Sequence, residues 1–279
     1  MDKKEKDRYL HIMQRLHEHL KYLIDKGYDV VYLGLQGSQN YDLDVYDDDY
    51  KSDIDTKAIV LPSFEDFVYN RTPISITEIL PNNEHIDVKD VRVMFETFKK
   101  QNINFLEILF TKFGIVMPEY NKIVQPLFDN KEKIAHLNYN QALKCMAGMS
   151  KEKLKALQHP YPSIIEKIEK YGYDGKQLHH ILRMNDFMRQ YVNGHSYECC
   201  LKPKIFTKNS LLKAKKNEIS CEVAIKIAQS IDADTYNLKE KYLKQEETID
   251  LDAIKILDEV KYNLLKYKYK KELINIDKK

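Results

Sequence analysis

The spacing of apolar residues along this chain changes near residue 120. Before that point, short apolar and β-branched runs predict strands, which lie at residues 29–35, 54–61, 74–80 and 84–91. The last two runs flank a Pro-Asn-Asn turn and so predict a hairpin. After residue 121 the apolar residues recur at helical spacing almost throughout. The pattern predicts an α+β fold, with a small mixed sheet in residues 1–120 and an all-helical domain in residues 121–279.

Helix ends are marked by their own signals. An amphipathic stripe predicts a helix from about Asp7 to Lys26, and Gly27 suits its left-handed C-cap. Ser63, with Asp66 three positions later, predicts the N-cap of a second helix. A helical period then begins at residue 91. These signals place the predicted strands between helices.

Composition narrows the class of protein. Hydrophobic residues make up 43% of the chain and charged residues 32%, as in soluble globular proteins. No apolar run approaches the roughly 20 residues that cross a bilayer. The first residues are charged and then amphipathic, without the apolar core of a signal peptide. We therefore expect a cytoplasmic protein with no membrane partner.

Charge is divided unevenly along the chain. Residues 1–120 carry 15 basic and 22 acidic side chains, whereas residues 121–279 carry 30 basic and 21 acidic ones. The two halves thus differ in sign, which suggests surfaces with different tasks. The last helical segment, residues 261–273, interleaves Lys with Tyr. That pattern fits either an RNA contact or an amphipathic helix whose lysines extend to water.

Two short motifs indicate candidate chemistry. Gly37 and Ser38 follow the first strand, where a turn into a helix N-terminus would present free N–H groups to an anion such as a triphosphate. Asp53 and Asp55 lie two residues apart at the start of the second strand, so alternation puts both carboxylates on one face. Their mutual repulsion is relieved by a divalent cation. Each motif alone also fits a plain turn or a solvated loop end.

A third carboxylate lies further along the chain. Asp87 has apolar neighbours in sequence on both sides, so its side chain faces away from their buried side. If its strand lies beside the strand of Asp55, it completes a three-carboxylate metal site. An exposed strand residue is the equally good alternative.

The order of these motifs resembles the DNA polymerase β superfamily of nucleotidyltransferases, and most closely its branch of bacterial and phage predicted nucleotidyltransferases. That branch has a G-S-x-x-Y turn, an S-D-x-D strand and a segment similar to NINFLEILF, found here at residues 102–110. Its helical part has a K-x-x-x-H-x-x-R pattern, matched here by Lys176, His180 and Arg183. The likeness extends from about residue 29 to residue 230.

The resemblance implies a role for each motif. Gly37 and Ser38 would hold the triphosphate, and Mg²⁺ or Mn²⁺ would be bound by three carboxylates, those of Asp53, Asp55 and Asp87. Basic side chains would contact the phosphates, namely Lys57, a candidate because it lies just past the two aspartates, and the residues of the helical pattern, Lys176, His180 and Arg183. The last three share one helix face at positions i, i+4 and i+7, which also fits a solvated basic face.

The chain departs from the family pattern at three places. Gln36 stands where the superfamily often has a glycine, and Asp42 stands where many members of the branch have one. The loop of residues 42–53 is long and acidic, with Asp47, Asp48 and Asp49 among its carboxylates. Its spacing lacks the central glycine and final glutamate of a calcium-binding loop. We expect a solvated loop that covers the nucleotide.

The sequence thus predicts a metal-dependent nucleotidyltransferase that moves a nucleoside monophosphate from a nucleoside triphosphate to an acceptor hydroxyl and releases pyrophosphate. An RNA or tRNA 3′ end is the favoured acceptor, because phosphate neutralisation suits the basic half of the chain. A protein or a small molecule fits as well. The alternative is a catalytically silent nucleotide- or RNA-binding module. A third possibility is an interaction protein that binds no nucleotide.

Overall fold

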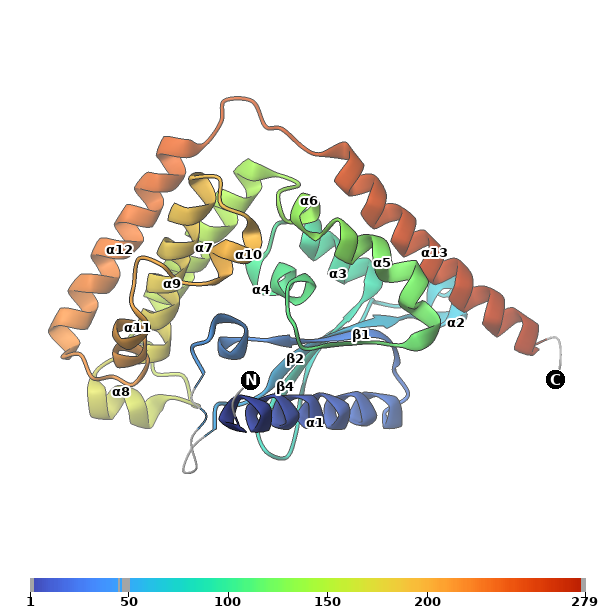
Figure 1. Cartoon of the computed structure of the whole chain (residues 1–279), viewed down its shortest axis with the longest axis horizontal. Coiled ribbons are helices and arrows are strands. Elements are labelled where there is room, and N and C mark those ends of the chain that lie inside the picture. Colours follow the sequence, from blue (N-terminus) through green and yellow to red (C-terminus); the bar gives the residue numbers. More distant parts are fainter. Residues whose placement is uncertain (1–2, 45, 47–50, 277–279) are drawn as a thin grey trace. The chain divides into compact units, whose positions relative to one another are not determined.

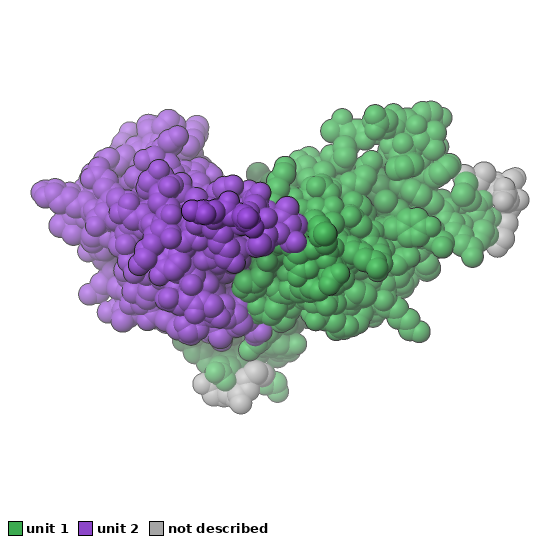
Figure 2. All heavy atoms as spheres, turned by 90° about the horizontal axis from the view of Figure 1, so that it is seen from above, with its two compact units in different colours: residues 1–40, 44–137, 250–279 green, residues 41–43, 138–249 purple. Residues whose placement is uncertain are grey.

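A computed structural model of the chain describes residues 3–44, 46 and 51–276 (Figure 1). The chain forms two compact units, which Figure 2 colours separately. Unit 1 comprises residues 1–40, 44–137 and 250–279, and unit 2 comprises residues 41–43 and 138–249. These units differ from the predicted division at residue 120, because residues 121–137 and 250–279 belong to unit 1. The sequence could not show this, since helical spacing indicates which side of a helix is buried but not which neighbour buries it.

Unit 1 is built on a five-stranded mixed sheet. Its strands are β1 (Asp29–Gln36), β2 (Asp55–Leu61), β3 (Ser75–Ile79), β4 (His85–Asp90) and β5 (Gly114–Val116). Their order is β3-β4-β2-β1-β5, and only the β2–β4 pair is parallel. The four predicted strands and the hairpin are confirmed, as is the α+β class. The short strand β5 was not among the predicted elements.

Helices cover both faces of this sheet (Figure 1). Helix α1 (Lys3–Asp25) lies along one face and buries Leu16 and Leu23 completely. The opposite face carries α3 (Val91–Lys99), α5 (Asn121–Asp129) and α13 (Leu251–Ile276). The last helix of the chain therefore packs with the sheet that the first helix covers. Shorter helices complete unit 1, namely α2 (Phe64–Val68), α4 (Ile103–Leu106), α6 (Lys131–Ala135) and the 3₁₀ helices η2 (Glu107–Leu109) and η3 (Pro118–Tyr120). The 3₁₀ helix η1 (Ser38–Tyr41) begins in unit 1, and its last residue belongs to unit 2.

The predicted helix signals are confirmed. Gly27 follows α1 with a φ of 85°, the left-handed conformation that glycine adopts without strain. Ser63 caps α2, and its hydroxyl accepts a hydrogen bond from the N–H of Asp66 while the Asp66 carboxylate accepts one from Ser63. Asp90 caps α3 through the N–H of Arg92. Local sequence therefore fixes these boundaries.

Unit 2 is helical. Three long helices, α7 (Tyr139–Ala156), α9 (Gly175–Val192) and α12 (Cys221–Tyr242), pack against one another. The shorter helices are α8 (Ile165–Tyr171), α10 (Tyr197–Leu201) and α11 (Lys208–Lys215). Buried polar side chains link its long helices; for example, the Ser150 hydroxyl donates to Asp232 at 2.7 Å. None of the helices in the described ranges is long and apolar enough to cross a membrane.

Candidate functional site

The turn after β1 is the first predicted motif. Gly37 has a φ of 96°, which only glycine adopts readily, and η1 begins at the next residue. The predicted helix after this turn is only a four-residue 3₁₀ helix, so it supplies little helix dipole. The N–H of Gly37 lies 3.3 Å from Oε1 of Glu107, a carboxylate that is 3% exposed. A buried acid thus occupies the position that the sequence assigns to a phosphate.

The short helix η1 positions the next motif. The Gln39 side chain is buried and donates to the carbonyl oxygen of Asp53 at 2.6 Å. Asn40 donates to the carbonyl oxygen of Leu35 at 2.9 Å, which ties η1 back to β1. Through these contacts the turn and the start of β2 form one connected edge of the sheet. Ser38 is half-buried there.

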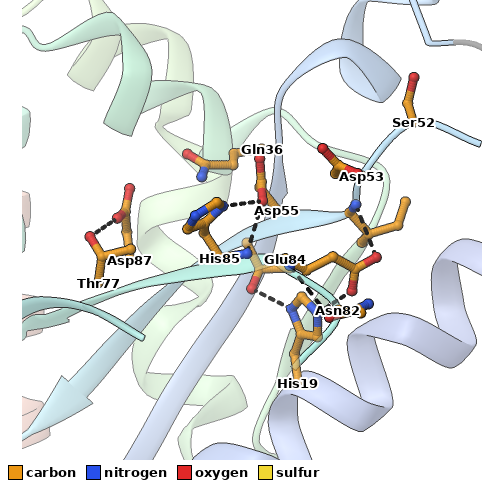
Figure 3. A network of polar contacts seen from close by, with 12 residues as sticks. His19, Gln36, Ser52, Asp53, Asp55, Thr77, Asn82, Glu84, His85 and Asp87 are labelled. Carbon is orange, nitrogen blue, oxygen red and sulfur yellow. Dashed lines mark hydrogen bonds and ion pairs between the residues drawn. The ribbon is translucent and has the colours of Figure 1, made fainter. Parts of the chain in front are cut away.

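Asp53 and Asp55 form the carboxylate pair of this edge. Ile54 between them is buried, whereas Asp53 is exposed and Asp55 half-exposed, as the alternation predicts. In Figure 3 both carboxylates lie on one side of the strands, with Gln36 beside Asp55. An oxygen of Asp55 accepts a hydrogen bond from the N–H of His85 at 2.9 Å and lies 3.2 Å from Nδ1 of that histidine. Within the described residues, neither carboxylate has an ion pair with Lys or Arg.

Asp87 has different surroundings. Its Oδ2 lies 2.9 Å from Nζ of Lys57, and the Thr77 hydroxyl donates to its Oδ1 at 2.7 Å. Burial raises the pKa of Asp87, but the charge of Lys57 and the two hydrogen bonds outweigh that effect and lower it. Asp87 is therefore a carboxylate whose negative charge is balanced by the positive charge of Lys57.

Lys57 is held just as firmly. It is 2% exposed, contacts the Gln36 amide oxygen and lies 4.3 Å from the centre of the Phe105 ring. Burial lowers its pKa, although Asp87 opposes this shift. The lysine predicted to contact phosphate is thus already occupied by protein groups.

The sheet register explains why the three carboxylates do not meet. In the parallel β2–β4 pair, Lys57 lies opposite Asp87 and Thr56 opposite Ile86, so His85 is the neighbour of Asp55. Asp87 is displaced by two residues along the strand, about 6–7 Å. Among the described residues, no three His, Cys, Asp or Glu side chains gather to hold a metal ion. The predicted three-carboxylate cluster is therefore not assembled in this arrangement.

The carboxylate pair by itself fits a divalent cation. Hard oxygen donors without a basic partner are what Mg²⁺ uses, and this ion commonly takes one or two carboxylates together with phosphate oxygens. The pair meets that requirement, and Asp87 does not. Of the three predicted metal ligands, Asp53 and Asp55 therefore stay the candidates for holding Mg²⁺ or Mn²⁺.

Behind the pair lies a set of contacts that we call the Glu84 network. The Glu84 carboxylate accepts two hydrogen bonds from Arg15, at 2.6 and 2.9 Å. It also lies 2.9 Å from Nε2 of His19 and accepts a hydrogen bond from the N–H of Ile54 at 3.2 Å. Nδ1 of His19 lies 2.9 Å from the Thr56 hydroxyl. Figure 3 shows Glu84 extending toward His19. The network holds the backbone between Asp53 and Asp55.

The electrostatics of Glu84 follow from these contacts. Burial alone would raise its pKa, but hydrogen bonds from His19, Arg15 and Asn82 outweigh burial and lower the pKa to about 2. Glu84, His85 and Glu107 are not among the candidate residues predicted from the sequence. The only sequence signal for Glu107 is an acid among apolar residues in the segment 102–110.

The predicted basic stripe lies on α9 of unit 2. Lys176 is exposed, whereas Arg183 is 7% exposed, with its guanidinium 3.5 Å from the centre of the Tyr41 ring. Burial lowers the pKa of His180 well below its usual value, so this histidine is uncharged at neutral pH. Only two of the three predicted cations therefore carry charge, and they belong to a different unit from the carboxylate pair.

The acidic loop is described only in part. Asp47, Asp48 and Asp49 lie outside the described residues. Asp44 forms an ion pair with Arg8, with N–O distances of 2.7 and 2.8 Å. Asp42 has a φ of 58°, the left-handed region that favours glycine. The position where the resembled branch has glycine thus has the conformation for which glycine is suited.

Comparison of the chain with models of protein families, with curated proteins and with solved structures finds no match. The resemblance to nucleotidyltransferases therefore stays a prediction that rests on the quoted motifs.

Proposed function

We propose that this chain is a metal-dependent nucleotidyltransferase. The observation that carries the proposal is the carboxylate pair. Nearby Glu84, Asp87 and Asp90 are each matched by a basic side chain, at 2.6–2.9 Å, whereas Asp53 and Asp55 have no Lys or Arg partner among the described residues. Two like charges held together without compensation are unfavourable unless a cation binds them.

The chain's own residues divide the work as follows. Asp53 and Asp55 hold Mg²⁺ or Mn²⁺, which when bound neutralises triphosphate oxygens and increases the acidity of an acceptor hydroxyl. Gln39 and Glu84 fix the peptide group between Asp53 and Ile54, Gln39 at its carbonyl oxygen and Glu84 at its N–H. Asp87 positions Lys57 rather than binding metal.

Phosphate contacts are assigned to the turn and to α9. Gly37 and Ser38 form the phosphate-binding turn, where a triphosphate oxygen competes with Glu107 for a hydrogen bond that is long at 3.3 Å. Lys176 and Arg183 of unit 2 stay phosphate contacts that the resemblance alone predicts, and His180 beside them is a neutral group. The favoured acceptor is the 3′ end of an RNA such as a tRNA, with a protein or small-molecule hydroxyl as the other candidates.

A second function is favoured by a specific observation. Because Asp87 is neutralised by Lys57 and Glu107 faces Gly37, the arrangement also suits a catalytically silent module that binds a nucleotide or RNA. Such a module would bind a nucleoside triphosphate without transferring it.

The test uses α-³²P-labelled nucleoside triphosphates, Mg²⁺ or Mn²⁺, and total RNA and protein as acceptors. We expect label on one class of macromolecule, and its loss when Asp53→Ala is combined with Asp55→Ala. The matched control is Glu166→Ala with Glu169→Ala, which removes two exposed carboxylates from α8. Transfer at the wild-type rate in the Asp53/Asp55 variant would overturn the proposal.

Two further measurements separate the alternatives. Asp87→Asn lowers transfer only partly if Asp87 positions Lys57, but abolishes it if Asp87 binds metal during the reaction. Calorimetry that detects metal-dependent nucleotide binding without any transfer supports the silent module. If neither binding nor transfer is detected, both functions are excluded and the interaction protein that binds no nucleotide remains.

A further inference from the structure

A groove of about 450 Å³ runs between α5 and α13 in unit 1. The two helices lie alongside each other in Figure 1. Along α13 the lining extends from Ile256 to Lys270, fifteen residues that span about 21 Å of helix. The groove is thus an elongated feature with an apolar lining that includes Val260. The proposed nucleotidyltransferase site uses none of these residues.

Three lysines give this groove a positive charge. Lys122, Lys266 and Lys270 are exposed in its lining, and none has an ion pair with Asp or Glu within the described ranges. Other lysines of α13 are paired: Lys261 lies 3.1 Å from Asp258. A set of uncompensated lysines on one surface attracts a polyanion.

The acidic side chains near the groove are few. Glu259 is the single acidic residue of the described lining, and it lies 3.8 Å from Lys255. The N-terminal end of α5 lies beside the end of α13 that carries the lysines, because Glu119 lies 4.0 Å from Lys271. Lys122 therefore belongs to the same end of the groove as Lys266 and Lys270.

An aromatic ring is held at that same end. Tyr267 is 38% exposed, and its ring packs edge-to-face on Tyr120 with centroids 5.6 Å apart. Tyr120 is itself buried and donates its hydroxyl to Asp29 at 2.8 Å. A ring supported in this way loses little conformational freedom when a flat ligand stacks on it. The groove thus combines a held aromatic ring with three lysines.

We propose that the α5–α13 groove binds a single-stranded nucleic acid, with its phosphates on the three lysines and a base stacked on Tyr267. Tracking of the backbone by charge and stacking of bases on aromatic rings are the two contacts that single strands offer without regard to sequence. An acidic peptide would use the lysines but leaves the tyrosine without a stacking partner. That the bound strand is the acceptor rests on the proposed function, whereas the binding itself does not.

The experiment measures fluorescence anisotropy of a labelled 12-nucleotide single-stranded RNA, in EDTA and without nucleoside triphosphate. Failure of the proposed transfer activity therefore leaves this test unaffected. The groove variant combines Lys122→Gln, Lys266→Gln and Lys270→Gln. We expect its Kd to rise at least about tenfold at moderate salt, and the slope of log K against log salt to become shallower by about 2, because each lost phosphate contact removes about 0.7 from that slope.

The matched control removes the same charge from α1. It combines Lys3→Gln, Lys6→Gln and Lys21→Gln, three exposed lysines on the opposite face of the sheet. We expect the RNA affinity of this control to stay within about twofold of wild type. Equal weakening in the groove and α1 variants would overturn the proposal, since net charge alone would then explain binding.

The aromatic contact is tested separately. Tyr267→Leu should weaken RNA binding about tenfold without changing the salt slope, whereas Tyr267→Phe should bind as wild type does, because it keeps the ring. Unchanged binding of Tyr267→Leu would overturn the stacking arrangement. Displacement of the RNA by polyglutamate of equal charge, at equal concentration, would overturn the choice of nucleic acid and favour an acidic peptide.

Discussion

Two acidic regions meet at the start of β2, and their surroundings differ sharply. Glu84 is almost completely buried and is matched by Arg15, His19 and a backbone N–H. The carboxylate pair of Asp53 and Asp55 is more exposed, and within the described residues its one neighbour at ion-pair distance is His85, which is charged only when protonated. The difference teaches that a compensated buried acid stabilises the fold, whereas an uncompensated exposed pair is available to bind a ligand.

The two regions are also mechanically connected. Glu84 accepts the N–H of Ile54, which lies between the two carboxylates of the pair, so the stabilising region holds the backbone of the binding region. Changes at Glu84 should therefore affect stability, and changes at the pair should affect binding and transfer.

The largest expected effect on stability follows from breaking the Glu84 network. Glu84→Gln removes the negative charge that pairs with half-buried Arg15 and accepts from buried His19, and breaking a buried ion pair costs about 3–5 kcal/mol. Urea unfolding followed by circular dichroism measures it. Glu78→Gln on β3, whose partners include tyrosine hydroxyls, is the comparison and should cost clearly less. Equal loss in the two variants would contradict the special role of Glu84.

A smaller effect depends on pH. Because the pKa of Glu84 is lowered from 4.5 to about 2, its ionised form stabilises the native state above about pH 4.5, and this contribution is lost as the pH falls toward 2. A shift of this size corresponds to about 3 kcal/mol. Unfolding free energies measured between pH 6 and pH 2 should therefore converge for wild type and Glu84→Gln. A difference that stays constant over that range would show that Glu84 is not the titrating group.

The smallest expected effect concerns the carboxylate pair. Asp53→Asn with Asp55→Asn should change the unfolding free energy by no more than about 0.5 kcal/mol in EDTA, as for exposed positions outside a network. The amide oxygen of an asparagine at position 55 can still accept the N–H of His85. Thermal melting in EDTA measures this change. Destabilisation as large as that of Glu84→Gln would show that the pair is structural.

Much of the fold could be predicted from local sequence. Strand runs, the glycine after α1 and the capping box of Ser63 and Asp66 act over a few residues, and the structure confirms them. The alternation of side chains along a strand also predicted that Asp53 and Asp55 lie on one face of the sheet, opposite buried Ile54. These features follow from the period of the backbone and from hydrogen bonds between near neighbours.

The remaining features depend on contacts between distant residues. Whether Asp87 or His85 lies beside Asp55 is decided by the register of a parallel strand pair, and a shift of two residues changes the answer while leaving the apolar pattern intact. The basic partner of Asp87 is likewise set by that register. The contact of Glu107 with Gly37 joins residues seventy positions apart, and no local pattern encodes it.

The return of α13 to unit 1 has a consequence for the order of folding. Residues 138–249 form unit 2, and they are complete before α13, which covers the sheet of unit 1, has been synthesised. On the ribosome the helical unit can therefore close while the α/β unit still exposes apolar surface. Of the two units, the α/β unit is therefore the later one able to reach its native state, although its first residues are synthesised first.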